Sequence, residues 1–259
     1  MLSFGMSSGA KPADLRATLA TEEASHLPAS VSRNLTFGML DTLGRAIVTG
    51  VYDDRRFPTE AELAQQYEVS RSVTREAVKM LTAKGLLTAR PRKGTTVQPS
   101  ACWNLFDTDV LRWLLERKFS LELLRQFSEL RIAIEPAAAS LAARSGSEAA
   151  IEAIRAGYDR MQAAEKGRDD ALDSDIAFHI AILDASANPF FMQFRDMVET
   201  ALRTSIRFTN RFKGRTASLP AHRKVLNAIV DRDPERARSA MAAIIADVMA
   251  LDDDAERSA

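Results

Sequence analysis

The chain has 259 residues, of which 46% are hydrophobic and 27% charged. This composition is enough for two globular domains and excludes a disordered chain. The formal charge is zero, and the single cysteine, Cys102, excludes an intramolecular disulfide. The sequence shows no apolar run long enough for a membrane span, and its N-terminus lacks the pattern of a secretory signal. We therefore expect a cytoplasmic protein with no membrane partner.

The charge is distributed unevenly along the chain. Residues 34–99 contain 10 basic and 7 acidic side chains, whereas residues 100–259 contain 22 basic and 25 acidic ones. Within the first of these segments, residues 71–93 carry seven basic side chains and one acid, Glu76. Such a local surplus can bind a polyanion even though the whole chain is neutral. A basic surface that binds nothing is the alternative, and charge alone does not decide between them.

The first expected elements are a tail and a helix. Residues 1–33 show no periodic pattern and are rich in Ser, Gly, Pro and Ala, which predicts a flexible tail. Apolar residues at helical spacing predict a helix over residues 35–49. Gly50 follows this helix and is expected to end it in a left-handed conformation.

Two short helices are expected next. Thr59 and Glu62 have the spacing of a capping box, which predicts a helix over residues 60–67. Ser70 is expected to cap a further helix that ends near residue 84. Strand-like runs at residues 86–90 and 95–98 then flank a turn that contains Pro and Gly. Three helices followed by a basic hairpin are the order of a winged helix-turn-helix.

The helix at residues 70–84 has two distinct faces when it is drawn at about 100° per residue. One arc is apolar and suits packing on the preceding helices; it consists of Val73, Ala77, Met80 and Leu81. The opposite arc is basic and polar; it consists of Arg71, Ser72, Arg75 and Lys79. A recognition helix needs this arrangement because its front enters the major groove while its back packs on the domain. We expect the hydroxyls of Ser72 and Thr74 to bind base edges or phosphates.

Everything after an expected linker at residues 100–109 is predicted to be helical. The fold class is therefore mainly α, with an N-terminal winged helix-turn-helix and a C-terminal all-α bundle. Pro136 is expected to kink or interrupt one long helix because it lacks a backbone donor. Asp233 and Pro234 form a strong helix start. The expected bundle helices cover residues 108–116, 121–144, 147–166, 168–187, 189–211, 217–231 and 234–251.

Asp175 and His179 are four residues apart, so both side chains lie on one face of their helix. Their neighbours, among them Ile176 and Ile180, are apolar around much of the circumference. A carboxylate and an imidazole beside so much apolar surface need polar partners, because an unpaired buried charge costs several kcal/mol. A divalent metal would be one such partner, and a hydrogen-bonded Asp–His pair without metal is the other possibility.

The N-terminal motifs resemble the DNA-binding domain of the GntR family of bacterial regulators. The matching stretches are Phe57-Pro58-Thr59-Glu60-Ala61-Glu62-Leu63-Ala64, Val69-Ser70-Arg71-Ser72-Val73-Thr74-Arg75-Glu76-Ala77, Leu81–Leu87 and Lys93-Gly94-Thr95. The resemblance implies operator contacts by Arg71, Arg75 and the wing glycine Gly94. Many members have an arginine where this chain has Ala61, so one base contact is missing. The full expected DNA-binding set is Arg71, Ser72, Thr74, Arg75, Lys79, Arg92, Lys93 and Gly94.

The C-terminal part is similar to the all-helical ligand-binding (FCD) domain of the FadR-type branch. The matching stretches are residues 129–136, 175–179 and 185–189, together with His222. The resemblance implies that His222 joins Asp175 and His179 around zinc or a similar divalent ion. Members with a complete site have another histidine 22 residues after the one that matches His222. Here that position is Ile244, so we expect an open site that the effector completes.

The resemblance also suggests how the effector is held. Arg131 matches the family arginine that faces the ligand and could pair with a carboxylate, although Glu135, four residues on, could occupy it instead. Arg203 is a second candidate for the carboxylate, or a surface arginine. The expected effector-binding set is therefore Arg131, Asp175, His179, Arg203 and His222.

Residues 103–113 are especially similar to regulators of sugar-acid operons, those of D-galactonate among them, which implies a hexonate-type effector. We therefore expect a repressor that binds double-stranded operator DNA as a homodimer under the control of a small sugar acid. A metal-dependent hydrolase built on Asp175, His179 and His222 is the competing class, but no general base or oxyanion donor accompanies these residues. An architectural DNA-binding protein without a ligand would leave the helical domain unexplained. The expected domains are 1–33 tail, 34–99 DNA-binding, 100–109 linker and 110–252 effector-binding.

Overall fold

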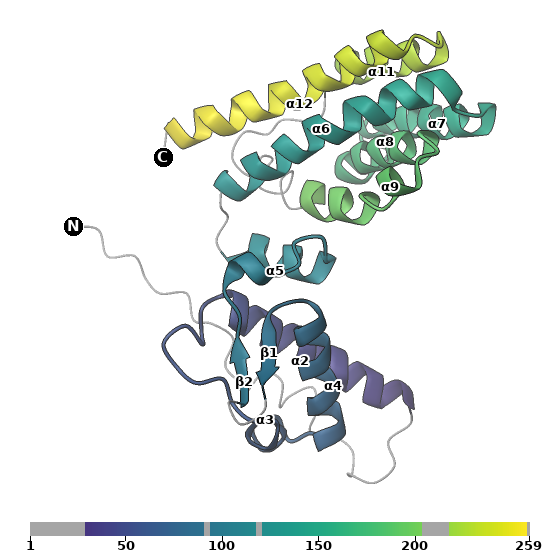
Figure 1. Cartoon of the computed structure of the whole chain (residues 1–259). Coiled ribbons are helices and arrows are strands. Elements are labelled where there is room, and N and C mark those ends of the chain that lie inside the picture. Colours follow the sequence, from purple (N-terminus) through teal and green to yellow (C-terminus); the bar gives the residue numbers. More distant parts are fainter. Residues whose placement is uncertain (1–28, 91–93, 118–120, 204–217, 258–259) are drawn as a thin grey trace. The chain divides into compact units, whose positions relative to one another are not determined.

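A computed structural model describes residues 29–90, 94–117, 121–203 and 218–257 (Figure 1). The chain divides between Asn104 and Leu105 into two compact units. The elements are α2 Ala29–Val48, α3 Glu60–Tyr67, α4 Arg71–Ala83, β1 Leu87–Arg90, β2 Gly94–Val97, the 3-10 helix η1 Ser100–Cys102, α5 Thr108–Arg117, α6 Leu121–Ser145, α7 Glu148–Glu165, α8 Ala171–Ala185, α9 Pro189–Met192, α11 Leu219–Val230 and α12 Pro234–Arg257.

The first unit consists of three helices and a two-stranded antiparallel hairpin. The hairpin pairs Leu87 with Val97 and Arg90 with Gly94. Helix α4 packs against α2, α3 and β1, and the side chains of Val73, Ala77 and Leu81 are buried on its inner face. The expected winged helix-turn-helix is therefore confirmed, and mainly α is the correct fold class.

The local signals of the first unit act as the sequence predicts. Thr59 and Glu62 form the reciprocal capping box of α3, and the Ser70 hydroxyl accepts a hydrogen bond from the Val73 amide at the start of α4. Gly50 has a φ of 78° directly after the α2 turn, in the left-handed region that glycine enters at little cost. Helix α2 differs from the prediction because it begins at Ala29, inside the expected tail. A helix once nucleated extends upstream without needing an apolar period of its own. The rest of the expected tail lies outside the described residues.

The second unit is a helical bundle with one continuous core. Helix α6 packs along α12 and α8, α7 along α8, and α11 along α12 and α7 (Figure 1). Leu111 and Leu115 of α5 join the same core. Among the described helices, none combines the length and the hydropathy that a bilayer crossing requires.

Two helix predictions in this unit need correction. Of the two effects expected of Pro136, a kink or an interruption, the interruption is wrong, since α6 runs continuously from Leu121 to Ser145. The single helix expected at residues 189–211 is broken, because α9 ends at Met192 and Gln193 and Phe194 form a turn before helix resumes at residues 195–203. The apolar residues around this break keep a helical spacing, so periodicity could not reveal it. The remainder of that predicted helix lies outside the described residues.

Helices α7 and α8 approach each other closely at Gly157. A Cβ atom at this position would lie 3.0 Å from the Cα and 3.1 Å from the backbone nitrogen of Phe178. The missing side chain therefore lets the two backbones meet. Phe178 is fully buried below this contact, and its ring centroid lies 6.0 Å from that of His179 and 5.2 Å from that of His222. The close packing of α7 on α8 thus positions an aromatic ring against both imidazoles.

We predict that Gly157→Ala lowers the free energy of unfolding by about 1–3 kcal/mol, because the new methyl group overpacks the α7–α8 contact. The matched control is Gly38→Ala in α2, where an added Cβ meets nothing within 4 Å. That variant should gain up to about 1 kcal/mol from helix propensity. Chemical denaturation of both variants measures the difference, and equal stabilisation by the two would contradict the close-packing argument.

Candidate functional site

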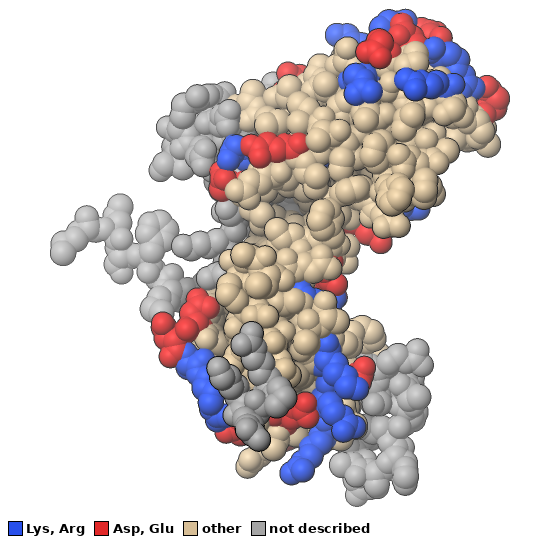
Figure 2. Space-filling view, viewed as in Figure 1, with Lys and Arg blue, Asp and Glu red and all other residues tan. Residues whose placement is uncertain are grey.

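The exposed face of α4 is basic. Arg71, Ser72, Arg75 and Lys79 are all exposed, while Val73, Ala77 and Leu81 on the other side are buried. Figure 2 shows lysine and arginine side chains gathered over the part of the first unit where α4 lies. The Lys79 ammonium lies 3.5 Å from Glu76, which offsets part of its charge. Arg71 and Arg75 therefore supply most of the positive charge on this face.

The other predicted DNA-binding residues have different outcomes. Thr74 is fully buried and its hydroxyl donates to the Ser70 carbonyl 3.3 Å away, so the prediction that Thr74 contacts DNA is wrong. A threonine in a helix commonly donates its hydroxyl hydrogen bond to the backbone carbonyl one turn earlier. Gly94 is exposed at the start of β2 with a φ of 77°. Arg92 and Lys93 lie outside the described residues.

Arg56 supplies a positive charge at the N-terminus of α3, where Ala61 replaces the arginine of other family members. Ala61 is exposed, and next to it Arg56 donates from Nη2 to Glu62 Oε1 at 2.6 Å. Hydrogen bonds from the Thr59 backbone and from Arg56 lower the pKa of Glu62 to about 2. The capping carboxylate is therefore ionised, and an exposed guanidinium compensates its charge.

Five polar side chains from three helices meet inside the second unit. Each is at least 95% buried; they are Arg131 and Glu135 of α6, Asp175 and His179 of α8, and His222 of α11. His222 Nε2 lies 3.1 Å from Asp175 Oδ1, and His179 Nε2 lies 3.8 Å from the same atom. The ligand atoms of Asp175, His179 and His222 all lie within 4.8 Å of one another. The structure thus brings the three predicted metal ligands together.

The hydrogen bonds around the cluster determine which nitrogen of each imidazole carries the proton. His222 Nδ1 lies 2.8 Å from the Ser218 carbonyl oxygen, which can only accept. His179 Nδ1 lies 2.6 Å from Glu135 Oε2, an ionised carboxylate that also accepts. Both Nδ1 atoms therefore donate, and in each neutral ring the Nε2 lone pair is left to face Asp175.

Two of the atoms that meet here make no hydrogen bond among the described residues. Asp175 Oδ1 and His222 Nε2 are buried and make no hydrogen bond although they are close together. A carboxylate and two imidazole lone pairs that converge on one point require a cation between them, either a metal ion or an added proton. Donor atoms that share one ion at about 2.1 Å lie about 3–4 Å apart, which the two distances to Asp175 match. The residues present therefore fit a divalent metal.

Arg131 does not have a free guanidinium. Its Nε donates to Glu135 Oε1 at 2.6 Å and its Nη2 lies 3.4 Å from Glu135 Oε2. Burial raises the pKa of Glu135, but the charge of Arg131, the charge that His179 carries when it is protonated, and hydrogen bonds from both residues lower it to about 2. Burial likewise raises the pKa of Asp175, and the two histidines with Arg131 bring it below its usual value. The cluster therefore holds two ionised carboxylates and one guanidinium.

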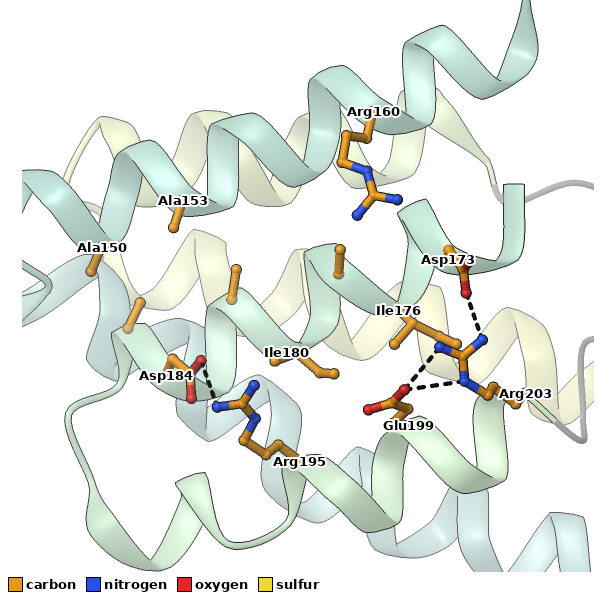
Figure 3. Close-up of a pocket in the computed structure, with 13 residues that line it drawn as sticks. Ala150, Ala153, Arg160, Asp173, Ile176, Ile180, Asp184, Arg195, Glu199 and Arg203 are labelled. Atoms are coloured by element: carbon orange, nitrogen blue, oxygen red, sulfur yellow. Dashed lines mark hydrogen bonds and ion pairs between the residues drawn. The ribbon is translucent and has the colours of Figure 1, made fainter. Parts of the chain in front are cut away.

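Arg203 is separated from this cluster. Its guanidinium binds Asp173 Oδ1 at 2.5 Å and Glu199 Oε1 at 2.8 Å, in an open groove of about 560 Å³ (Figure 3). Asp173 and Asp175 are two residues apart in α8, about 200° around the helix, so they face nearly opposite sides. The prediction that Arg203 shares a site with Asp175 is wrong for this reason.

The contact between Glu135 and His179 was missed from the sequence. The i,i+4 spacing of Arg131 and Glu135 suggested a simple ion pair, whereas Glu135 also accepts from a histidine 44 residues away. A glutamate on an apolar helix face was the available signal, because a buried carboxylate has more lone pairs than one arginine satisfies.

We predict a pH dependence that follows from Glu135. Its folded-state pKa of about 2 lies below the ordinary value of 4.5, so its ionic contacts stabilise the fold above about pH 4.5. That contribution disappears as the pH falls towards 2. The loss of unfolding free energy caused by Glu135→Gln should therefore be smaller at pH 3 than at pH 6 in denaturant titrations. An equal loss at both pH values would contradict this account of the carboxylate.

Comparison with known proteins assigns a family model to each of the two units. Residues 41–97 match the family model for bacterial regulatory proteins of the gntR family, and residues 126–247 match the FCD domain. The uncharacterized HTH-type transcriptional regulator YieP of Escherichia coli is 32% identical over 219 residues, covering 83% of this chain and 94% of that protein. The galactonate operon transcriptional repressor of the same organism is 32% identical over 218 residues, covering 82% and 94%.

A solved structure of a Streptococcus agalactiae GntR protein aligns with 83% of this chain and 98% of its own, at 25% identity and a TM-score of 0.45. The family and the relatives are transcriptional regulators, so the hydrolase alternative finds no support in them. The chain belongs to the GntR family of bacterial transcriptional regulators, with a winged helix-turn-helix followed by an FCD domain.

Proposed function

We propose that this regulator represses a sugar-acid catabolic operon and releases its operator when a hydroxy acid binds a divalent metal in the bundle. The metal would be held by Asp175, His179 and His222, and would supply a Lewis-acidic anchor for a carboxylate. The observation that carries the proposal is the convergence of three buried ligand atoms, two of which, Asp175 Oδ1 and His222 Nε2, make no hydrogen bond among the described residues. The similarity to a galactonate operon repressor supports the choice of effector.

The charge of the cluster favours a monocarboxylate. With both imidazoles neutral, Glu135 and Asp175 outnumber the Arg131 guanidinium, which leaves a buried net charge of −1. A divalent cation changes this to +1, and one carboxylate then brings it to zero. Because uncompensated buried charge is unfavourable, metal and a single carboxylate together balance the charge of the cluster better than either alone.

The donor count favours a ligand with a hydroxyl beside its carboxylate. Three protein donors leave coordination positions open on zinc or a similar ion, and Ile244 offers no donor where other family members have histidine. A 2-hydroxy acid fills two positions with one carboxylate oxygen and one hydroxyl. Galactonate has this arrangement, and galactose does not. Arg131 is occupied by Glu135, so in this proposal the metal, rather than the guanidinium, is the main carboxylate anchor.

At the DNA end, we propose that two copies bind a palindromic operator, with one α4 in each half-site about a helical turn apart. Arg71 and Arg75 would contact bases or phosphates, and Ser72, Lys79 and the wing at Gly94 would add to the interface. The effector controls this binding only if it prefers one of two conformations of the protein. In the proposed repressor the preferred conformation is the one that binds the operator weakly.

We predict that Arg71→Ala or Arg75→Ala weakens operator binding by about 10- to 100-fold, because each change removes about 1–3 kcal/mol of base or phosphate contact. A gel-shift titration measures this with a duplex that the wild-type protein has selected from random-sequence DNA. The matched control is Arg155→Ala in α7, an exposed arginine paired with Glu152. Unchanged affinity in both α4 variants would overturn the assignment of α4 as the recognition helix.

We predict that D-galactonate raises the melting temperature by several degrees in the presence of zinc, since a ligand at 100 times its Kd adds about 2.7 kcal/mol. Galactose, which lacks the carboxylate, and hexanoate, which lacks the hydroxyls, should give little shift. Removal of the metal with a chelator, or the change His222→Ala, should abolish the response to galactonate. A galactonate shift that persists after chelation would refute the metal anchor. An equal shift with galactose would refute the requirement for a carboxylate.

A further inference from the structure

We propose that Glu135 is a positioning residue that holds His179 with its Nε2 lone pair aimed at the metal position. The inference rests on the metal site proposed above. It assigns a role to a helix that contributes no metal ligand, because Glu135 lies on α6 whereas the three ligands lie on α8 and α11.

The geometry around Glu135 is that of a shared carboxylate. One oxygen accepts from Arg131 Nε at 2.6 Å, and the other accepts from His179 Nδ1 at 2.6 Å. The side chain of Glu135 is 99% buried and that of His179 is 98% buried, so water does not compete for these bonds. The carboxylate therefore fixes both the tautomer and the ring orientation of His179.

Arg131 has a different part in this arrangement. Its Nε donates to Glu135 Oε1 at 2.6 Å and its Nη2 lies 3.4 Å from Glu135 Oε2, so the guanidinium holds the carboxylate in place. A carboxylate paired in this way accepts from His179 Nδ1 with its other oxygen, 2.6 Å away. The contacts run from Arg131 through Glu135 to His179, and each group orients the next.

His222 is oriented without an acidic side chain. Its Nδ1 donates to the Ser218 carbonyl, one turn earlier in the same chain segment. The two histidines are thus held differently, one by a backbone oxygen and one by an ionised carboxylate. A carboxylate behind an imidazole increases the basicity of the opposite nitrogen more than a carbonyl does, so His179 should be the stronger metal ligand.

The first test measures the affinity for zinc of the full-length protein in competition with a colorimetric chelator. Loss of a partner behind a metal-bound histidine typically weakens binding by about 10- to 100-fold, and we expect that range for Glu135→Gln. The matched control is Glu152→Gln, the same change at an exposed glutamate of α7. Unchanged zinc affinity in a folded Glu135→Gln protein would overturn the proposal.

The second test reads the tautomer directly and needs no metal. The chain has only three histidines, His26, His179 and His222, so selective ¹⁵N labelling gives three imidazoles to assign by single substitutions. In metal-free wild-type protein we expect His179 to be protonated at Nδ1. In Glu135→Gln we expect partial transfer of the proton to Nε2, while His222 keeps its Nδ1 proton.

The two tests separate the possible failures. If wild-type protein binds no zinc but His179 shows the Nδ1 tautomer, the proposed metal function fails and the role of Glu135 in orienting His179 stands. If His179 lacks its Nδ1 proton in wild-type protein, the role of Glu135 is refuted whatever the metal affinity. The wild-type measurement also decides the matter if Glu135→Gln does not fold.

Discussion

The interior of the bundle depends on one constraint, which is that a carbonyl and an ionised carboxylate can only accept hydrogen bonds. Because Ser218 and Glu135 accept from the Nδ1 atoms of His222 and His179, both imidazoles carry their proton on the side away from Asp175. The remaining lone pairs then converge on a carboxylate that is itself 95% buried. No rearrangement of these protons satisfies all three groups without an additional positive charge. The need for a cation is therefore a consequence of the hydrogen bonds.

The same groups determine how the helices of the bundle fit together. Glu135, His179 and His222 come from α6, α8 and α11, and each must present one particular face to the others. Buried ion pairs add little net stability compared with apolar packing. Removing one partner, however, strongly destabilises the fold because the other charge is left buried and uncompensated. The cluster thus opposes rotation or sliding of any of the three helices. Phe178 has the same effect through packing, since it is fully buried against both imidazole rings.

What the sequence could predict depends on the range of the interaction. The capping box at Thr59, the cap at Ser70 and the two faces of α4 involve residues within one or two turns, and all were predictable. The contact between Glu135 and His179 spans 44 residues, and no local pattern encodes it. Thr74 was misassigned although the interaction is local. Residue spacing does not show whether a hydroxyl at the edge of a helix face points outward or donates to a carbonyl of its own helix.

In the proposed mechanism, the absence of a fourth protein ligand has a functional consequence. A complete four-donor site can hold its metal tightly whether or not the effector is present. With Ile244 at the fourth position, the protein supplies three donors, and a chelating hydroxy acid would supply the rest. The effector then raises the affinity for metal, and by thermodynamic linkage the metal raises the affinity for effector by the same factor. A regulator of this kind would respond to the acid and the metal together, whereas a family member with the full ligand set could respond to the acid alone.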